Sequence, residues 1–80
     1  MEEAKSRLET ISVEGTAGDN EVKISMNGNR KVLSVEIAPH LLFPEKKEQV
    51  EELLEIAITR ALEAAEKVNE AEMKSAGRDL

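Results

Sequence analysis

The longest uninterrupted pattern in this 80-residue chain is a run of helix-forming residues from Pro44 to Ala76, with no glycine and no further proline inside it. A helix of this length would extend about 50 Å, because an α-helix rises about 1.5 Å per residue. A strand of five residues covers only about 17 Å. Any sheet that this chain builds is therefore shorter than the helix, and part of the helix must extend past it.

The apolar side chains of this run recur at helical spacing and form a wide face. A face this wide usually packs against two partners. We expect the first half, with Val50, Leu54 and Ala57, to lie on a sheet, and the second half to meet a helix of a second copy of the chain. The residues assigned to this homodimer interface are small or short and permit close approach of two helices: Ala61, Ala64, Ala65 and Val68.

Three short segments before the helix alternate apolar and polar residues, which is typical of half-buried strands. The clearest is Val22 to Met26, and the dipeptide Asn27-Gly28 follows it at once. Asn-Gly is the strongest short hairpin signal and predicts a type I′ turn. The glycine at position 15, inside the first segment, predicts a bulge or an early strand end. The fold class predicted is α+β, in a single domain over residues 1–80: a helix remnant at 1–8, a three-stranded antiparallel meander at 10–37 and the long helix at 44–76.

Eighty residues bury only about 60–65% of the surface that the unfolded chain exposes, so the core of one copy is small. The chain has no cysteine and one histidine, so disulfides are absent and a structural metal site is not expected. A three-stranded sheet also leaves two unpaired edges. A two-fold homodimer would supply the missing burial.

No residue pattern indicates catalysis. His40 follows a proline in a predicted turn, no serine lies in a strand-to-helix elbow, and the paired carboxylates Glu51 and Glu52 fit a solvated helix face. Glu63, Glu66 and Glu70 lack a histidine to accompany them in a metal site. We expect no enzymatic activity, no cofactor, no bound metal and no small-molecule substrate.

The formal net charge of −6 disfavours a general nucleic-acid binder, whose affinity comes mainly from lysine and arginine. No stretch approaches the roughly 20 apolar residues of a membrane span, so no membrane association is expected. From the residues alone, the basic side chains are interpreted as ordinary surface charges. In a symmetric dimer, however, each would appear twice on one assembly. The candidates are Lys5, Arg7, Lys23, Arg30, Lys31, Arg60, Lys67, Lys74 and Arg78.

The ordered combination of segments resembles the YbaB/EbfC family of bacterial nucleoid-associated proteins. It comprises the glycines at 15 and 18, the strand and turn Val22 to Gly28, the element Ile37 to Leu42, and the helix core Leu53 to Ala61. The resemblance implies an intertwined homodimer whose helices protrude and bind duplex DNA in the cytoplasm or nucleoid.

The leading hypothesis is thus a homodimeric nucleoid-associated protein that binds double-stranded DNA and influences nucleoid organisation and gene expression. The alternative is a dimeric protein-interaction adaptor without direct DNA binding. The residues predicted to contact DNA lie near both chain ends: Lys5, Arg7, Lys67, Lys74 and Arg78.

Overall fold

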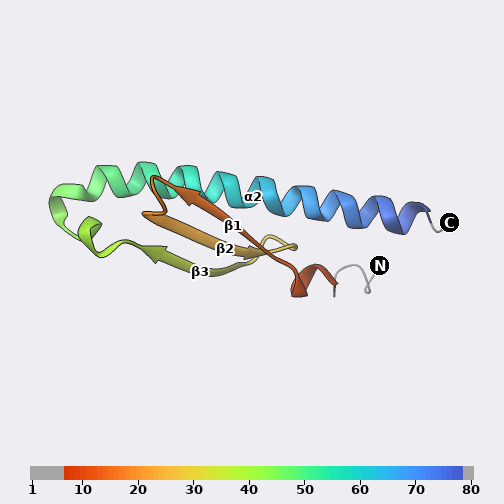
Figure 1. The fold of residues 1–80 in the computed structure, drawn as a ribbon. Coiled ribbons are helices and arrows are strands. Elements are labelled where there is room, and N and C mark those ends of the chain that lie inside the picture. Colours follow the sequence, from red (N-terminus) through yellow and green to blue (C-terminus); the bar gives the residue numbers. More distant parts are fainter. Residues whose placement is uncertain (1–6, 79–80) are drawn as a thin grey trace.

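The computed structural model describes residues 7–78 of the chain, with side chains as far as residue 73. Three antiparallel strands precede one long helix, as Figure 1 shows, so the predicted α+β order is confirmed. The elements are β1 (Ser12–Ala17), β2 (Val22–Asn27), β3 (Val32–Ile37), the short 3₁₀ helices η1 (Pro39–Leu41) and η2 (Pro44–Lys46), and α2 (Lys47–Arg78).

The boundaries of two elements differ from the prediction. Residues 7–10 are helical, so Thr10 does not begin a strand, and its hydroxyl donates to the carbonyl of Arg7 at 2.7 Å. Most of the predicted helix remnant at 1–8 lies outside the described residues. Pro44 begins a 3₁₀ turn that leads into the α-helix, where its fixed φ and missing N–H cost little.

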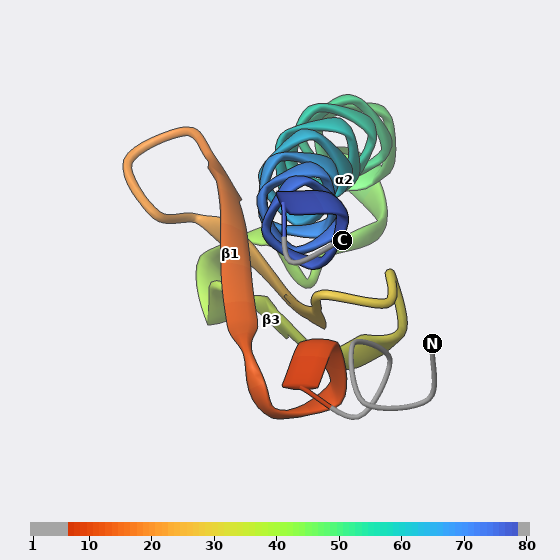
Figure 2. The same ribbon diagram turned by 90° about the vertical axis from the view of Figure 1, so that its right-hand side faces the viewer.

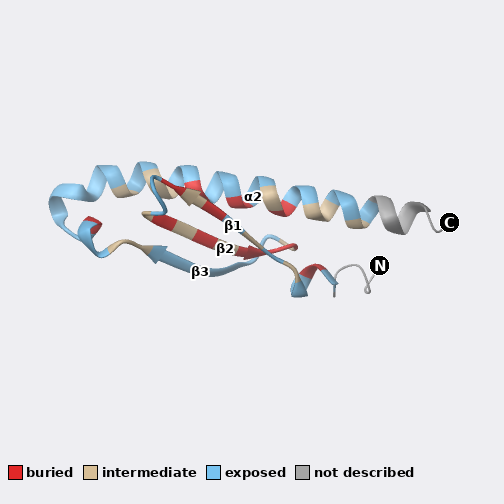
Figure 3. Ribbon diagram, in the orientation of Figure 1, coloured by how far each residue is buried: buried red, intermediate tan, exposed pale blue. Residues whose placement is uncertain are grey.

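The core lies between α2 and the first two strands. Val22, Ile24 and Met26 alternate along β2 and are fully buried, as the period of two predicts. Figure 3 shows this burial concentrated on β1, β2 and the facing side of α2. The helix lies over β1 and β2, so β3 stands at the uncovered side of the sheet (Figure 2).

Gly15 in β1 is the point of closest approach between the helix and the sheet. A Cβ atom at this position would overlap the backbone of Ala57 and Ala61 in α2. The prediction of a bulge or early strand end at Gly15 is wrong, because β1 pairs with β2 without interruption from Ser12 to Ala17. The glycine is instead needed for contact with the helix.

The inner face of β3 is only half covered. Val35 pairs with Ile24, and a register shift between Ser25 and Met26 then places Val32 opposite Met26. Paired residues share a face, so both valines point to the core side. They nevertheless remain 50% and 51% exposed, because α2 does not extend over them. The fold of one chain thus leaves apolar surface beside its core.

The turn between β2 and β3 is a hairpin, but the predicted type I′ geometry is wrong. Neither Asn27 nor Gly28 has a positive φ, whereas Arg30 has φ 67°. The Arg30 N–H donates to the Asn27 carbonyl and the Asn27 N–H donates to the Lys31 carbonyl, both at 2.9 Å. This is a three-residue loop that ends in a left-handed residue.

Candidate nucleic-acid interface

The final part of α2 projects beyond the sheet and makes the molecule elongated, with principal extents of 55 × 15 × 15 Å. Residues 66–78 are called the arm here, since Ala65 is the last fully buried residue among the helix side chains that are described, which end at residue 73. Thirteen residues of helix extend about 20 Å. Figure 2 looks along the molecule from this end and shows the arm, residues 7–10 and the β2–β3 turn gathered together.

Three hydrogen bonds join the β2–β3 turn to its two neighbours. The Gly28 N–H donates to the carbonyls of Leu8 at 2.8 Å and Ile11 at 3.0 Å, and the Asn69 amide nitrogen donates to the Gly28 carbonyl at 3.5 Å. Leu8 is only 1% exposed, and a Cβ atom on Gly28 would come within 2.7 Å of its Cδ2. The turn, the first described helical residues and the base of the arm therefore form one packed junction.

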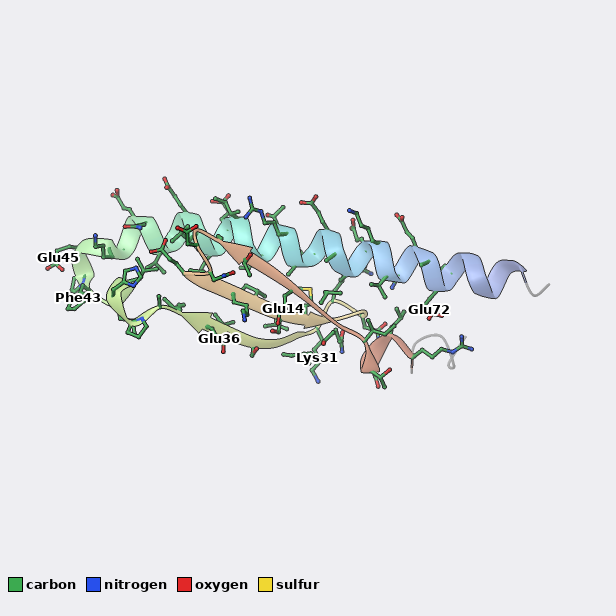
Figure 4. The ribbon with its side chains drawn as sticks, viewed as in Figure 1. Glu14, Lys31, Glu36, Phe43, Glu45 and Glu72 are labelled. Atoms are coloured by element: carbon green, nitrogen blue, oxygen red, sulfur yellow. The ribbon has the colours of Figure 1, made fainter. Side chains whose placement is uncertain are left out.

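Two of the predicted DNA-contacting side chains, Arg7 and Lys67, are described and lie at this end. Arg7 is exposed and its guanidinium lies 3.5 Å from the Glu72 carboxylate, which points from α2 toward the side of residues 7–10 (Figure 4). Lys67 is exposed on the arm. Lys74 and Arg78 occupy arm positions of α2, although their side chains lie outside the described set, and Lys5 lies outside it altogether.

The predicted dimer residues divide into two groups. Ala61 and Ala65 are 0% exposed and belong to the core cluster with β1 and β2, so the folded chain has no surface there for a second copy. Their assignment to the dimer interface is corrected for this reason. Ala64 and Val68 are half-buried at the edge of the same helix face. These two remain candidates for a dimer contact.

Two basic residues outside the predicted DNA-contacting set also lie at this end. Arg30 and Lys31 are exposed in the β2–β3 turn, and Figure 4 shows Lys31 beside residues 7–10 on the side away from α2. Their spacing from the other candidates along the chain gives no reason to group them. Only the Asn27-Gly28 turn signal in the sequence bears on their position, because it predicts that both residues lie at one tip of the sheet.

The opposite end of the molecule is acidic. Figure 4 shows Glu45 just before the start of α2, near the exposed Phe43. Five carboxylates over residues 45–55 outnumber the two lysines at 46 and 47, and Lys47 lies 3.9 Å from Glu51. The carboxylates are Glu45, Glu48, Glu51, Glu52 and Glu55. The unfavourable net charge is therefore concentrated away from the arm.

His40 lies beside a carboxylate of the first hairpin turn. It is exposed, and its Nε2 lies 2.6 Å from the Glu21 carboxylate. Over residues 7–78, no three or more histidine, cysteine or acidic side chains are placed to hold a metal ion. Within the same range, no helix has both the length and the apolar composition needed to cross a bilayer.

Comparison with known proteins agrees with this arrangement. The model of the YbaB/EbfC DNA-binding family matches residues 1–80. The chain belongs to this family. A nucleoid-associated protein of Flavobacterium johnsoniae is 37% identical over 98% of this chain and 72% of its own length. A nucleoid-associated protein of Beijerinckia indica is 40% identical over 92% of this chain and 73% of its own length.

The fold of this YbaB/EbfC member also occurs among solved structures. A crystal structure of an uncharacterized protein from Helicobacter pylori superimposes with a TM-score of 0.84, covering 94% of this chain and 78% of the other. The two sequences are only 20% identical, so this likeness concerns the fold alone. The family resemblance inferred from the sequence is confirmed by the family match and the nucleoid-associated relatives.

Proposed function

We propose that this YbaB/EbfC family member binds duplex DNA as a homodimer in the cytoplasm, at the nucleoid, and has no enzymatic role. The family match over residues 1–80 carries the proposal. The charge distribution gives it a physical basis, because the acidic and basic residues of the arm balance whereas residues 45–55 carry an excess of acid. DNA would approach the arm end, because the acidic end repels phosphates.

The proposed contacts are phosphate contacts rather than base contacts. Lysine and arginine neutralise phosphates and release counterions, an effect that does not depend on base sequence. The residues predicted to contact DNA keep this role here as a proposal: Lys5, Arg7, Lys67, Lys74 and Arg78. In a homodimer each of them occurs twice, which doubles the number of available contacts.

The half-covered face of β3 supports the homodimer. Ile58 and Leu62 are 40% and 37% exposed and share a helical stripe with Asn69, which bonds the β2–β3 turn. This stripe is therefore the side of α2 that faces β3, near Val32 and Val35. A second copy covering these four apolar side chains would add to the core of each chain, while the half-buried Ala64 and Val68 keep their predicted role in the dimer as a proposal.

Fluorescence anisotropy with a labelled duplex at several salt concentrations tests the DNA contact. We expect the logarithm of the binding constant to fall by about 0.9 per phosphate contact for each tenfold rise in salt. The variant Lys67→Glu/Lys74→Glu should lose most of this binding. The matched control Lys46→Glu/Lys47→Glu makes the same charge change at the acidic end and should bind nearly as well as the wild type.

A homodimer that ignores the duplex even at low salt would refute direct DNA binding and favour the adaptor function. Equal losses in the two charge-reversal variants would instead show that only net charge matters. Static light scattering on the same samples reports the oligomeric state in each case.

Light scattering also tests the proposed dimer surface. Val35→Glu places a charge on the half-covered face and should convert the dimer to a monomer. Ser34→Glu makes a similar change on the opposite face of the same strand and should leave the dimer intact. A dimer that survives Val35→Glu would place the interface elsewhere.

A further inference from the structure

Arg30 adopts a backbone conformation that its residue type disfavours. Its φ of 67° lies in the left-handed region, where the Cβ atom of most residues meets the following carbonyl oxygen. Glycine or asparagine usually occupies this position of a three-residue hairpin loop. A residue kept in such a conformation is a reason to look for a function of its side chain.

The turn keeps this conformation through Asn27 rather than through Arg30. The Asn27 side chain is buried, and its Oδ1 accepts hydrogen bonds from the N–H groups of Asn29 at 2.9 Å and Lys31 at 3.0 Å. These bonds, with the backbone bonds between Asn27 and both Arg30 and Lys31, determine the path of the loop. The Arg30 side chain takes no part in them.

The fold makes no use of the two charges in this turn. Arg30 and Lys31 are exposed, and neither side chain forms an ion pair or hydrogen bond with any residue in the described part of the chain. Lys23 and Arg60 differ, since Lys23 lies 3.8 Å from the Glu36 carboxylate and Arg60 donates to the Thr16 carbonyl at 2.8 Å. The two charges of the turn are thus available to a partner.

The turn is held at the base of the arm. Gly28 bonds Leu8, Ile11 and Asn69, so the cations two and three residues later cannot move far from the arm. From Asn69 to Arg78 the helix rises about 14 Å. The major groove of B-DNA is about 12 Å wide. The helix beyond the turn is therefore about as long as one groove is wide.

We propose that Arg30 and Lys31 form an additional phosphate-binding site for duplex DNA at the base of the arm. The inference rests on the proposed DNA binding and extends it to the β2–β3 turn. The contact is independent of base sequence, because exposed cations at a turn tip meet the backbone of the duplex. It divides the arm end into two contact points, one at the turn and one along α2.

The test compares the DNA affinity and salt dependence of Arg30→Gly/Lys31→Gln with those of Lys46→Gln/Lys47→Gln. Both variants remove two positive charges from each chain, so a weakening due to net charge alone is the same in both. We expect the turn variant to bind more weakly than the control. We also expect the magnitude of its salt slope to fall by about 1 for each phosphate that the turn no longer neutralises.

The Arg30→Gly substitution also separates the effect on DNA binding from the effect on folding. Because glycine accepts φ 67° readily, Arg30→Gly should leave the thermal unfolding midpoint unchanged or raise it while the affinity falls. Arg30→Lys keeps the charge and should retain most of the wild-type affinity. A merely structural role of Arg30 would produce the opposite pattern, with a lower midpoint and no specific change in the salt slope.

The outcomes separate this proposal from the function on which it rests. If the wild type binds the duplex, Lys67→Glu/Lys74→Glu loses binding and the turn variant matches its control, then the turn site is refuted and DNA binding by the arm stands. If the wild type does not bind duplex DNA, both proposals fail together. A weaker turn variant with a smaller salt slope supports the site.

Discussion

Both hairpin turns of the sheet contain left-handed residues, but the residue types at these positions differ. The acidic turn, residues 18–21, has two left-handed residues, Gly18 at φ 65° and Asn20 at φ 63°. The basic turn, residues 28–31, has Arg30 at φ 67°. Glycine and asparagine tolerate this region, and arginine does so at a cost. The comparison indicates that the acidic turn is fitted to its conformation and the basic turn retains a side chain for its charge.

The two turns also differ in how they are attached. In the acidic turn, the Glu21 N–H donates to the Ala17 carbonyl at 3.2 Å, and the Glu21 carbonyl accepts from the Ala38 N–H at 2.8 Å, with His40 also beside Glu21. The basic turn is packed against Leu8 and Asn69, which come from distant parts of the chain. A defect in the acidic turn should therefore remain local, whereas a defect in the basic turn should affect the arm end.

The largest effect is expected from removing the anchor of the basic turn. Leu8→Ala deletes a side chain that is 1% exposed and should lower the free energy of unfolding by about 2–4 kcal/mol. Chemical denaturation measures this change. In the native protein, hydrogen exchange of the Gly28 amide should accelerate while that of Glu21 stays unchanged. Equal acceleration in both turns would contradict the difference in attachment.

A smaller effect is expected from the side chain that shapes the basic turn. Asn27→Ala removes the acceptor for two backbone N–H groups and should destabilise the protein by about 1–2 kcal/mol. Denaturant unfolding gives the value. Asn27→Asp retains an acceptor oxygen and should destabilise the protein less than the alanine variant. A greater destabilisation by aspartate would mean that burial of charge outweighs the two hydrogen bonds.

Glycine substitution compares the two left-handed positions directly. Arg30→Gly should raise the free energy of unfolding by roughly 0.5 kcal/mol, because relief of the left-handed cost of about 1–2 kcal/mol exceeds the entropy cost of glycine. Asn20→Gly should change it by less, since asparagine already tolerates this conformation. Thermal melts of both variants measure the difference. A larger increase in the free energy of unfolding for Asn20→Gly than for Arg30→Gly would contradict the greater strain inferred at Arg30.

The smallest effect is expected at the ion pair of the acidic turn. His40→Gln removes the partner of Glu21, but both groups are solvent-accessible, with side chains 61% and 26% exposed. The free energy of unfolding should change by less than about 1 kcal/mol, and less still in high salt. Denaturation at two salt concentrations checks this. A large destabilisation that persists in salt would show that the pair holds the acidic turn to η1.

The order of the elements can be predicted from the sequence, but not every contact between them. Period-two alternation at Val22, Ile24 and Met26 and the long helical run after Pro44 determine the α+β fold, and both patterns are local. The predicted turn type is wrong because the Asn-Gly signal describes two residues, whereas the Asn27 side chain bonds residues further along the loop. That geometry depends on the buried position of Asn27.

The helical periodicity also does not predict what the alanines of α2 pack against. Ala61 and Ala65 have the size for close contact with a helix or with a strand, and periodicity alone does not distinguish the two. The alanines pack against β1 because Gly15 has no side chain, so the helix backbone at Ala57 and Ala61 can contact the strand directly. Arg30 and Lys31 cannot be grouped with the arm from the sequence, since their proximity arises only through Gly28 and Asn69.

The contact of Gly15 with α2 has a mechanical consequence for the whole molecule. Backbone against backbone leaves no flexible side chain between strand and helix to absorb a tilt, so the helix behaves as a lever mounted directly on the sheet. For an arm of about 20 Å, a tilt of about 10° at the mount would displace the tip by about 3 Å. That is close to the rise of about 3.4 Å per nucleotide along the axis of the DNA duplex. In the proposed complex with DNA, a glycine inside the sheet would thus set where along the duplex the tip of α2 lies.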